Sequence, residues 1–128
     1  MMIEIYTDGS CKKNGNGGWA FTIDFPDGDT WVEWGTVFDT TNNRMEMTAV
    51  IKALQRLEED DIIIYTDSRY VIGGASLGWK QKKNLDLWPE LITEVIRLQP
   101  EFKWVKGHNG NPRNEEVDKL AQEASGVR

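Results

Sequence analysis

The stretch DIIIYTD, residues 61–67, decides the fold. Its almost unbroken run of apolar, β-branched residues is typical of a strand that is covered on both faces, and such strands are usually parallel to a neighbour. Its last four letters also occur at residues 5–8. Because side chains alternate along a strand, two parallel neighbours of this kind would release Asp8 and Asp67 at the same edge and on the same face. Open α/β sheets bind their ligands at that edge, so we expect a functional site there.

The patterns on either side of this stretch predict one mixed sheet covered by helices. We expect strands at residues 2–7, 19–25, 30–38, 61–66 and 101–106. We expect helices at residues 43–59, 68–77, 85–98 and 114–124, the second of them weakened by Gly73 and Gly74. The first three strands, joined by turn-forming residues, would make an antiparallel meander. The predicted fold class is therefore α/β, with a five-stranded mixed sheet of three antiparallel and then two parallel strands and helices on both faces.

Length and composition favour one catalytic or binding domain in a reducing compartment. A chain of 128 residues is long enough for one core, so we expect a single domain over residues 1–128. No apolar run approaches the roughly 20 residues of a membrane span, and the first residues do not resemble a signal peptide. The single cysteine, Cys11, cannot form an internal disulfide. We therefore expect a cytoplasmic protein that does not contact a membrane.

The net charge argues against a protein that holds nucleic acid through bulk positive charge. The formal charge is −6 and the pI is about 4.8, whereas nonspecific nucleic-acid binding relies on lysine and arginine. Local basic clusters do occur, and part of the negative charge would be neutralised if acids form a metal site. The clustered lysines are Lys12, Lys13, Lys80, Lys82, Lys83, Lys103 and Lys106.

Four carboxylates are candidates for one metal site. Besides Asp8 and Asp67, Glu46 stands in the first turn of a predicted helix but on its core-facing side. Burying a carboxylate without a partner is costly, so this position favours a bound cation. Asp118 lies beside the apolar stripe of the last helix. Such hard oxygen ligands suit Mg²⁺ or Mn²⁺, and two ions about 4 Å apart can drive phosphodiester hydrolysis.

Each acid also has an ordinary explanation. Asp8 can form a turn with the small residues after it, and Asp67 can cap a helix. Glu46 can complement a helix dipole, and Asp118 can be a solvated helical residue. The combination favours the metal site, because acids at two equivalent strand ends and on the inner side of a helix can meet at one point. The chain also offers no better nucleophile: Cys11 has no histidine nearby in sequence, and there is no G-x-S-x-G or P-loop motif.

Five segments together resemble type 1 ribonuclease H. They are YTDGSC (6–11), TTNNRMEMTAVIKAL (40–54), IYTDSRYV (64–71), NLDLW (84–88) and WVKGHNGNPRNEEVDKLA (104–121). They occur in the order and spacing of that family and cover nearly the whole chain. The resemblance implies a ribonuclease H-like fold and an enzyme that cuts the RNA strand of an RNA/DNA hybrid with divalent metal. It also implies products with 3'-hydroxyl and 5'-phosphate ends.

The resemblance carries catalytic roles to individual residues. The catalytic acids and metal ligands of the family fall on Asp8, Glu46, Asp67 and Asp118, which implies two Mg²⁺ ions, with Mn²⁺ as a possible substitute. His108 aligns with a loop histidine that assists proton transfer or product departure, and a titratable side chain near the scissile phosphate fits that role. Its ordinary explanation is an exposed loop residue.

The resemblance also implies residues that contact the hybrid. Residues that would touch the minor groove, where the 2'-hydroxyls are displayed, are Cys11, Asn14, Asn42, Asn43 and Arg69. Thr41 and Asn84 align with residues that hold a phosphate of the DNA strand. Without the resemblance, Thr41 and its neighbours read as a helix-capping region and Asn84 as a loop residue. Independently, Trp79 is interleaved with lysines, a common nucleic-acid contact, which adds Trp79, Lys80, Lys82 and Lys83.

Further expectations concern packing, affinity and rival functions. We expect the other tryptophans in the core, namely Trp19, Trp31, Trp34, Trp88 and Trp104.

The segment of residues 73–84 is shorter than the corresponding segment of many bacterial members, which carry a basic protrusion there. We therefore expect weak, salt-sensitive substrate binding. We expect a monomer without an obligatory protein partner. The rival functions are a DNA resolvase or exonuclease of the same superfamily and a non-catalytic hybrid-binding module.

Overall fold

The computed structural model describes residues 2–58, 61–106 and 110–126. The strands are β1 (Met2–Cys11), β2 (Gly17–Asp24), β3 (Thr30–Val37), β4 (Asp61–Thr66) and β5 (Glu101–Trp104). The helices are α1 (Asn42–Gln55), α2 (Arg69–Ser76), α3 (Leu87–Leu98) and α4 (Pro112–Ser125). None of these helices is both long and apolar enough to cross a bilayer.

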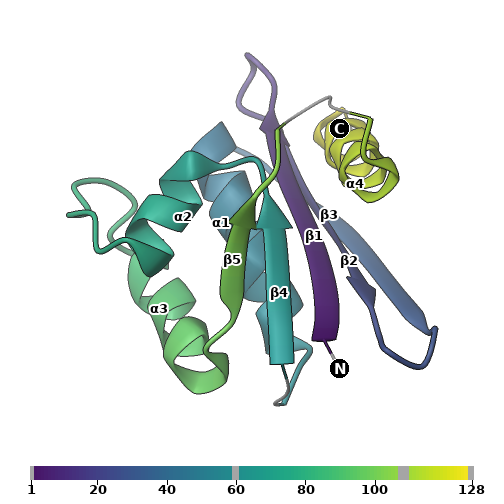
Figure 1. Cartoon of the computed structure of the whole chain (residues 1–128). Helices are drawn as coiled ribbons and strands as arrows, with labels where there is room; N and C mark the ends of the chain where they lie inside the picture. Colours follow the sequence, from purple (N-terminus) through teal and green to yellow (C-terminus); the bar gives the residue numbers. More distant parts are fainter. Residues whose placement is uncertain (1, 59–60, 107–109, 127–128) are drawn as a thin grey trace.

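The strands form one five-stranded sheet in the order β3-β2-β1-β4-β5 (Figure 1). β1 pairs antiparallel with β2, and β2 pairs antiparallel with β3. β1 and β4 are parallel, and so are β4 and β5. The predicted fold class, with its three antiparallel and two parallel strands, is confirmed.

The two copies of Ile-Tyr-Thr-Asp lie in register on neighbouring strands. Ile5 is opposite Ile64, and Tyr6 is opposite Tyr65. The two tyrosine rings stack with their centroids 4.5 Å apart and their planes 12° apart. The repeated letters therefore describe two equivalent positions along one parallel ladder, and both strands lead beyond the tyrosine to the same edge of the sheet.

Helices cover both faces of the sheet, as expected. α1 packs on one face and shares the large core with α2 and α3, whereas α4 lies alone on the other face (Figure 1). A smaller core beneath α4 joins Tyr6 and Ala20 of the sheet to Val117 and Ala121 of the helix. Tyr6 thus marks the α4 face, and the isoleucine before it, Ile5, belongs to the α1 face.

Two glycines let helices approach the sheet closely. A side chain at Gly9 would collide with the backbone of α1 at Met45 and Glu46. One at Gly18 would collide with the α4 backbone at Ala121. The helix that carries Glu46 therefore lies directly against the end of β1, which no bulkier residue at position 9 would allow.

Several boundaries differ from those predicted. β1 continues to Cys11, because residues 8–11 still pair with β2, so the turn is shorter than predicted. α1 ends at Gln55, where the N–H of Arg56 bonds back to Ala53 and Leu54. α4 begins at Pro112 rather than at residue 114, because Asn111 caps it and proline fits its first turn.

The tryptophan prediction was only partly right. Trp19 and Trp88 are buried, at 8% and 4% exposure, as predicted. Trp31, Trp34 and Trp104 are 42%, 58% and 45% exposed, so the prediction that they lie in the core was wrong. The reason is strand order, because β3 and β5 are the two edge strands of the sheet. A side chain of an edge strand is only partly covered by the helices, even where the sequence pattern predicts that it points into the core.

The glycine pair of α2 lets two indole rings pack against the helix backbone. A side chain at Gly73 would overlap the ring of Trp79, and one at Gly74 would overlap the ring of Trp88. Each indole therefore lies against bare helix backbone. The sequence signal was present, but its meaning depended on two aromatic residues that come after the helix.

Candidate active site

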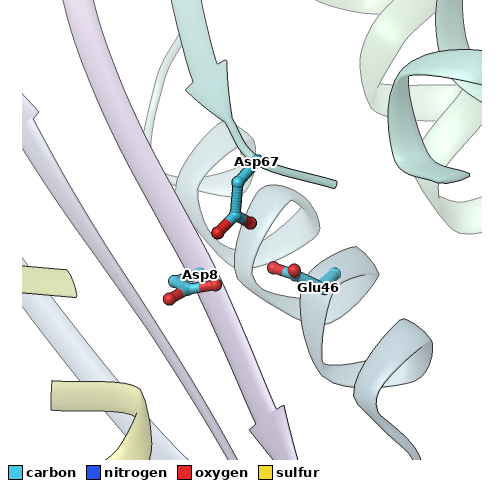
Figure 2. A group of neighbouring side chains, drawn as sticks. All are labelled: Asp8, Glu46 and Asp67. Carbon is cyan, nitrogen blue, oxygen red and sulfur yellow. The ribbon is translucent and has the colours of Figure 1, made fainter. Parts of the chain in front are cut away.

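Three carboxylates meet where the ladder between β1 and β4 ends (Figure 2). Asp8 comes from β1, Asp67 directly follows β4, and Glu46 comes from α1. One oxygen of each lies within 4.8 Å of the others. Three segments far apart in sequence thus converge on one point, and a group of oxygen donors this compact is able to hold a hard divalent cation.

The sheet and helix geometry explains why they converge. The ladder between β1 and β4 ends at Tyr6 and Tyr65, so Asp8 and Asp67 each come two positions after the last paired residue. They therefore leave the sheet at the same edge and with the same parity. Glu46 reaches this edge because the α1 backbone approaches β1 at Gly9.

Local hydrogen bonds decide between the ordinary and the functional explanations of the two aspartates. The cap of α2 is Ser68, whose Oγ accepts the N–H of Val71 at 3.1 Å, so the explanation of Asp67 as the cap is wrong. Asp8 lies within β1 rather than in a turn, and its Oδ1 accepts the N–H of Gly9 at 2.9 Å. Neither carboxylate is needed to end its strand.

The electrostatics of this group favour a bound cation. Asp8 is 3% exposed, and burial, followed by the charge of Asp67 and a hydrogen bond with Asp118, raises its pKa to about 8. Burial, followed by the charges of Asp8 and Asp67, raises the pKa of Glu46 well above its usual value. Glu46 Oε1 is buried without a hydrogen-bond partner among the described residues. A cation would remove both the repulsion and the missing contact.

Asp118 lies at the border of this group. It approaches Asp8 from α4, and its two carboxylate oxygens accept from Nε2 of Gln122 at 3.3 and 3.2 Å. It does not belong to the compact set formed by the other three acids. The four predicted acids therefore divide into three that converge and one, on α4, that adjoins them beside Asp8.

The loop with His108 lies outside the described residues, but the anchor after it is visible. Asn111 caps α4 by accepting the N–H of Asn114 at 3.0 Å, and its Nδ2 donates to the hydroxyl of Tyr6 at 3.2 Å. Asn111 and the start of α4 are thereby fastened to β1 two residues before Asp8. Sequence reasoning missed this contact, although the Asn-Pro pair is a recognisable helix-start signal.

Five predicted substrate residues surround the start of α1. Thr41 caps the helix by accepting the N–H of Arg44 at 3.2 Å, so its capping explanation is confirmed. Asn42 and Asn43 are exposed in its first turn. Cys11 donates to the carbonyl of Thr40 at 3.3 Å, and Asn14 Oδ1 accepts the N–H of Asn16 at 2.9 Å within the adjoining turn.

Asn84 is held in place by a network that the sequence did not reveal. Its Nδ2 donates to the Tyr70 hydroxyl at 3.0 Å, and its Oδ1 accepts from Arg44 at 3.3 Å. Arg44 also forms a two-pronged ion pair with Asp86 at 2.9 and 2.8 Å. This pair lowers the pKa of Asp86 to about 2. Because Arg44 belongs to α1, the network fixes Asn84 relative to the helix that bears Thr41.

The remaining predicted residues lie around α2. The guanidinium of Arg69 lies over the ring of Trp104, 4.4 Å from its centroid. Trp79 is 53% exposed, and the three lysines after it, Lys80, Lys82 and Lys83, are exposed as well. Trp79 and these lysines share one cleft of about 250 Å³ with Tyr70 and Trp88.

Comparison with known proteins identifies a family. The profile of the family described as RNase H matches residues 1–126. Ribonuclease H of Treponema denticola is 43% identical, over 97% of this chain and 97% of its own length. Ribonuclease H of Novosphingobium aromaticivorans is 41% identical, over 96% of both.

Solved structures agree with the sequence relatives. LC9-RNase H1, described as a type 1 RNase H with the type 2 active-site motif, superposes with a TM-score of 0.81 at 32% identity. The alignment covers 98% of this chain and 72% of that one. The N-terminal RNase H domain of a Mycobacterium tuberculosis protein gives a TM-score of 0.83 at 24% identity, over 97% and 93% of the two chains, and supports the fold alone.

Proposed function

The chain belongs to the RNase H family and is a nuclease, and from this premise we propose that it cuts the RNA strand of RNA/DNA hybrids endonucleolytically. Cleavage leaves 3'-hydroxyl and 5'-phosphate ends. The observation that carries the proposal is the convergence of Asp8, Glu46 and Asp67 at the carboxyl edge of the sheet. A family relationship alone would be compatible with a chain that binds hybrids without cutting them, but the convergence of these three acids supports cleavage.

Two Mg²⁺ ions, replaceable by Mn²⁺, are the metals we propose for this site. The donor set fits them, because it consists of carboxylate oxygens and includes a buried oxygen of Glu46 without a partner among the described residues. Bound divalent ions would lower the pKa of the attacking water and stabilise the oxygen that leaves. Asp8, Glu46, Asp67 and Asp118 are the proposed ligands.

The protein groups have separable tasks in this proposal. Asp8 is central, because it interacts with Glu46 and Asp67 on one side and with Asp118 on the other. Its carboxylate becomes deprotonated at neutral pH when cations offset the neighbouring charges. Asp118 completes the site from α4. His108 takes up or supplies a proton at its imidazole as the product departs.

The hybrid is held by groups on both sides of the carboxylates. Cys11, Asn14, Asn42, Asn43 and Arg69 are proposed for the minor groove. Thr41 and Asn84 are proposed for a phosphate of the DNA strand. The link from Arg44 of α1 to Asn84 supports this pairing, because it fixes the two segments relative to each other. Trp79 and Lys80, Lys82 and Lys83 are proposed to contact the substrate beyond the cleavage site.

A substrate comparison tests the function. Labelled RNA/DNA hybrid, double-stranded DNA and double-stranded RNA of one sequence are incubated with the protein and Mg²⁺. We expect internal cuts in the RNA of the hybrid alone, with ligatable 5'-phosphate ends. Cleavage of the DNA duplex would favour a resolvase or exonuclease, and binding without cleavage would favour a hybrid-binding module.

The proposal also covers the number of domains, the oligomeric state and the location of the enzyme. Residues 1–128 form a single catalytic domain that acts as a monomer in the cytoplasm and needs no obligatory protein partner. Sedimentation at the concentrations used for cleavage tests the monomer. A dimer whose dissociation removed activity would contradict it.

A further inference from the structure

A second cleft lies between α2 and β5, on the other side of Trp79 from the lysines. Its lining residues are Arg69, Ile72, Leu77, Trp79 and Trp104, and its volume is about 310 Å³. We refer to it as the α2–β5 cleft; both elements are visible side by side in Figure 1. Three of its large apolar side chains are substantially exposed: Leu77 at 62%, Trp79 at 53% and Trp104 at 45%.

One wall of this cleft is held rigid by the helix behind it. Trp79 lies against Gly73, where a side chain would overlap the indole ring. The main-chain N–H of Trp79 donates to the carbonyl of Gly73 at 3.0 Å. The chain reaches this position through Gly78, whose φ of +72° is unfavourable for other residues. The indole is therefore positioned in advance, although half of its surface faces solvent.

The other wall is connected to the carboxylate cluster. Nε1 of Trp104 donates to the main-chain carbonyl of Asp67 at 3.2 Å. The guanidinium of Arg69 covers one face of the same indole, 4.4 Å from the ring centroid. The cleft thus begins beside the residue that supplies one of the three converging carboxylates.

The lining fits one class of occupant better than others. Indole faces and a guanidinium plane are the surfaces on which unpaired bases stack in nucleic-acid-binding proteins. The lining contains one cation and no acid, in a chain of formal charge −6. By contrast, the groove below Trp34 is lined with Leu120, Glu123 and Ala124, and its acid disfavours a phosphate-bearing ligand.

We propose that the α2–β5 cleft binds an unpaired base of the RNA strand where that strand continues beyond the end of the hybrid. The proposal rests on the proposed function, because the nucleotide reaches the cleft only when a hybrid occupies the carboxylate edge. Stacking on Trp79 and on the Arg69–Trp104 pair would hold the base. Hybrids bordered by single-stranded nucleic acid would then be preferred over blunt hybrids.

Paired substrates test the proposal. One hybrid is blunt, and others extend the RNA strand by unpaired nucleotides at its 3' or its 5' end. Each extended hybrid is also made with abasic sites in place of the bases, which keeps the phosphates. For one of the two ends we expect the base-bearing extension to raise kcat/KM about fivefold or more over its abasic counterpart, as the loss of one base stack predicts.

Variants assign the effect to the cleft. Trp79→Leu and Trp104→Leu should reduce the ratio of base-bearing to abasic kcat/KM towards one. Trp104→Phe keeps an aromatic face and should retain most of that ratio even if overall activity falls with the lost N–H donor. Trp34→Leu is the matched control, because it removes an exposed tryptophan elsewhere and should leave the ratio unchanged. Because each ratio is internal to one protein, partial loss of folded enzyme does not alter it.

The outcomes separate this inference from the function itself. Failure to cut any hybrid would contradict the proposed function. Cleavage with equal rates for base-bearing and abasic extensions at both ends would overturn the cleft proposal alone and would favour a protein segment as its occupant. A base-dependent ratio that survives Trp79→Leu and Trp104→Leu would also overturn it, since the base would then bind elsewhere.

Discussion

The carboxylate edge and the region around α2 are neighbours built in opposite ways. Asp8 and Asp67 lie two positions beyond the last paired residues of the β1–β4 ladder, and Glu46 reaches them because the α1 backbone packs against Gly9. The residues proposed to bind substrate around α2 instead comprise exposed aromatic rings, lysines and one side-chain network. The carboxylates are therefore positioned by the sheet ladder, whereas the proposed substrate contacts are surface groups that can change without altering the ladder. We expect substitutions to affect kcat in the first region and KM in the second.

The largest effect should come from removing a carboxylate. Asp8→Asn or Asp67→Asn should lower kcat about a thousandfold or more, as is usual for residues that act as one catalytic unit. The metal-free protein should be as stable or more stable, because repulsion among the acids is relieved. Steady-state kinetics and urea unfolding in EDTA measure the two quantities.

An exposed acid provides the control for those variants. Glu90→Gln on α3 should change neither kcat nor stability appreciably, since Glu90 is exposed. If Asp8→Asn retained turnover, or if it unfolded at clearly lower urea concentration, Asp8 would belong to the scaffold and the contrast between the two regions would fail.

The next largest effect should come from the close contact between Gly9 and α1. Gly9→Ala places a methyl group against the backbone of Met45 and Glu46, and overpacking of this kind costs about 2–3 kcal/mol. Glu46 should also move away from Asp8 and Asp67, so Mg²⁺ affinity should fall. Gly126→Ala is the matched control, because the nearest atom would be 3.5 Å away. Urea unfolding measures the loss of stability, and calorimetric titration measures the Mg²⁺ affinity. An unaltered Mg²⁺ affinity would mean that the contact between Gly9 and α1 does not position Glu46.

The pH dependence of metal-free stability should report the buried acids. The pKa of Asp8 is raised from 3.8 to about 8, so between these values the folded state binds more protons than the unfolded state. Stability in EDTA should therefore be greatest near pH 4 and decline by a few kcal/mol towards pH 8. Asp8→Asn should flatten the decline, and Mg²⁺ should stabilise the wild type most at the alkaline end. A flat profile in the wild type would contradict this.

The smallest effect should come from the lysines. Changing Lys80, Lys82 and Lys83 to Ala should raise KM several-fold, leave kcat nearly constant and reduce the salt slope by about one per lost phosphate contact. The control is the double variant Lys52→Ala and Lys119→Ala, whose lysines are exposed on other helices. An unchanged salt slope in the triple variant would mean that the hybrid does not reach these lysines.

The carboxylate edge could be predicted from sequence because its residues follow the regular side-chain periods of strands and helices. Alternation along the strands gave Asp8 and Asp67 a common face, and helical spacing placed Glu46 on the core side. The same reasoning failed for Trp31, Trp34 and Trp104, because the side-chain period does not tell which strands lie at the edges of the sheet. Burial at an edge depends on strand order, a property of the whole chain.

The contacts around α2 and α3 could not be predicted for a different reason. Arg44, Tyr70 and Asn84 join through side chains that are separated by 14 to 40 positions in sequence. No local pattern marks such a network. Asn111 is an intermediate case: its role as a cap was readable from the proline after it, but its bond to Tyr6 was not.

Gly78, the residue through which the chain leaves α2, has a consequence for protein engineering. A Cβ at this position would meet nothing within 4 Å, and the backbone already turns sharply there. The carboxylates and the ladder that carries them lie outside this connection. A longer basic segment inserted at Gly78 would therefore leave the ladder intact, provided that it keeps the turn that places Trp79 against Gly73.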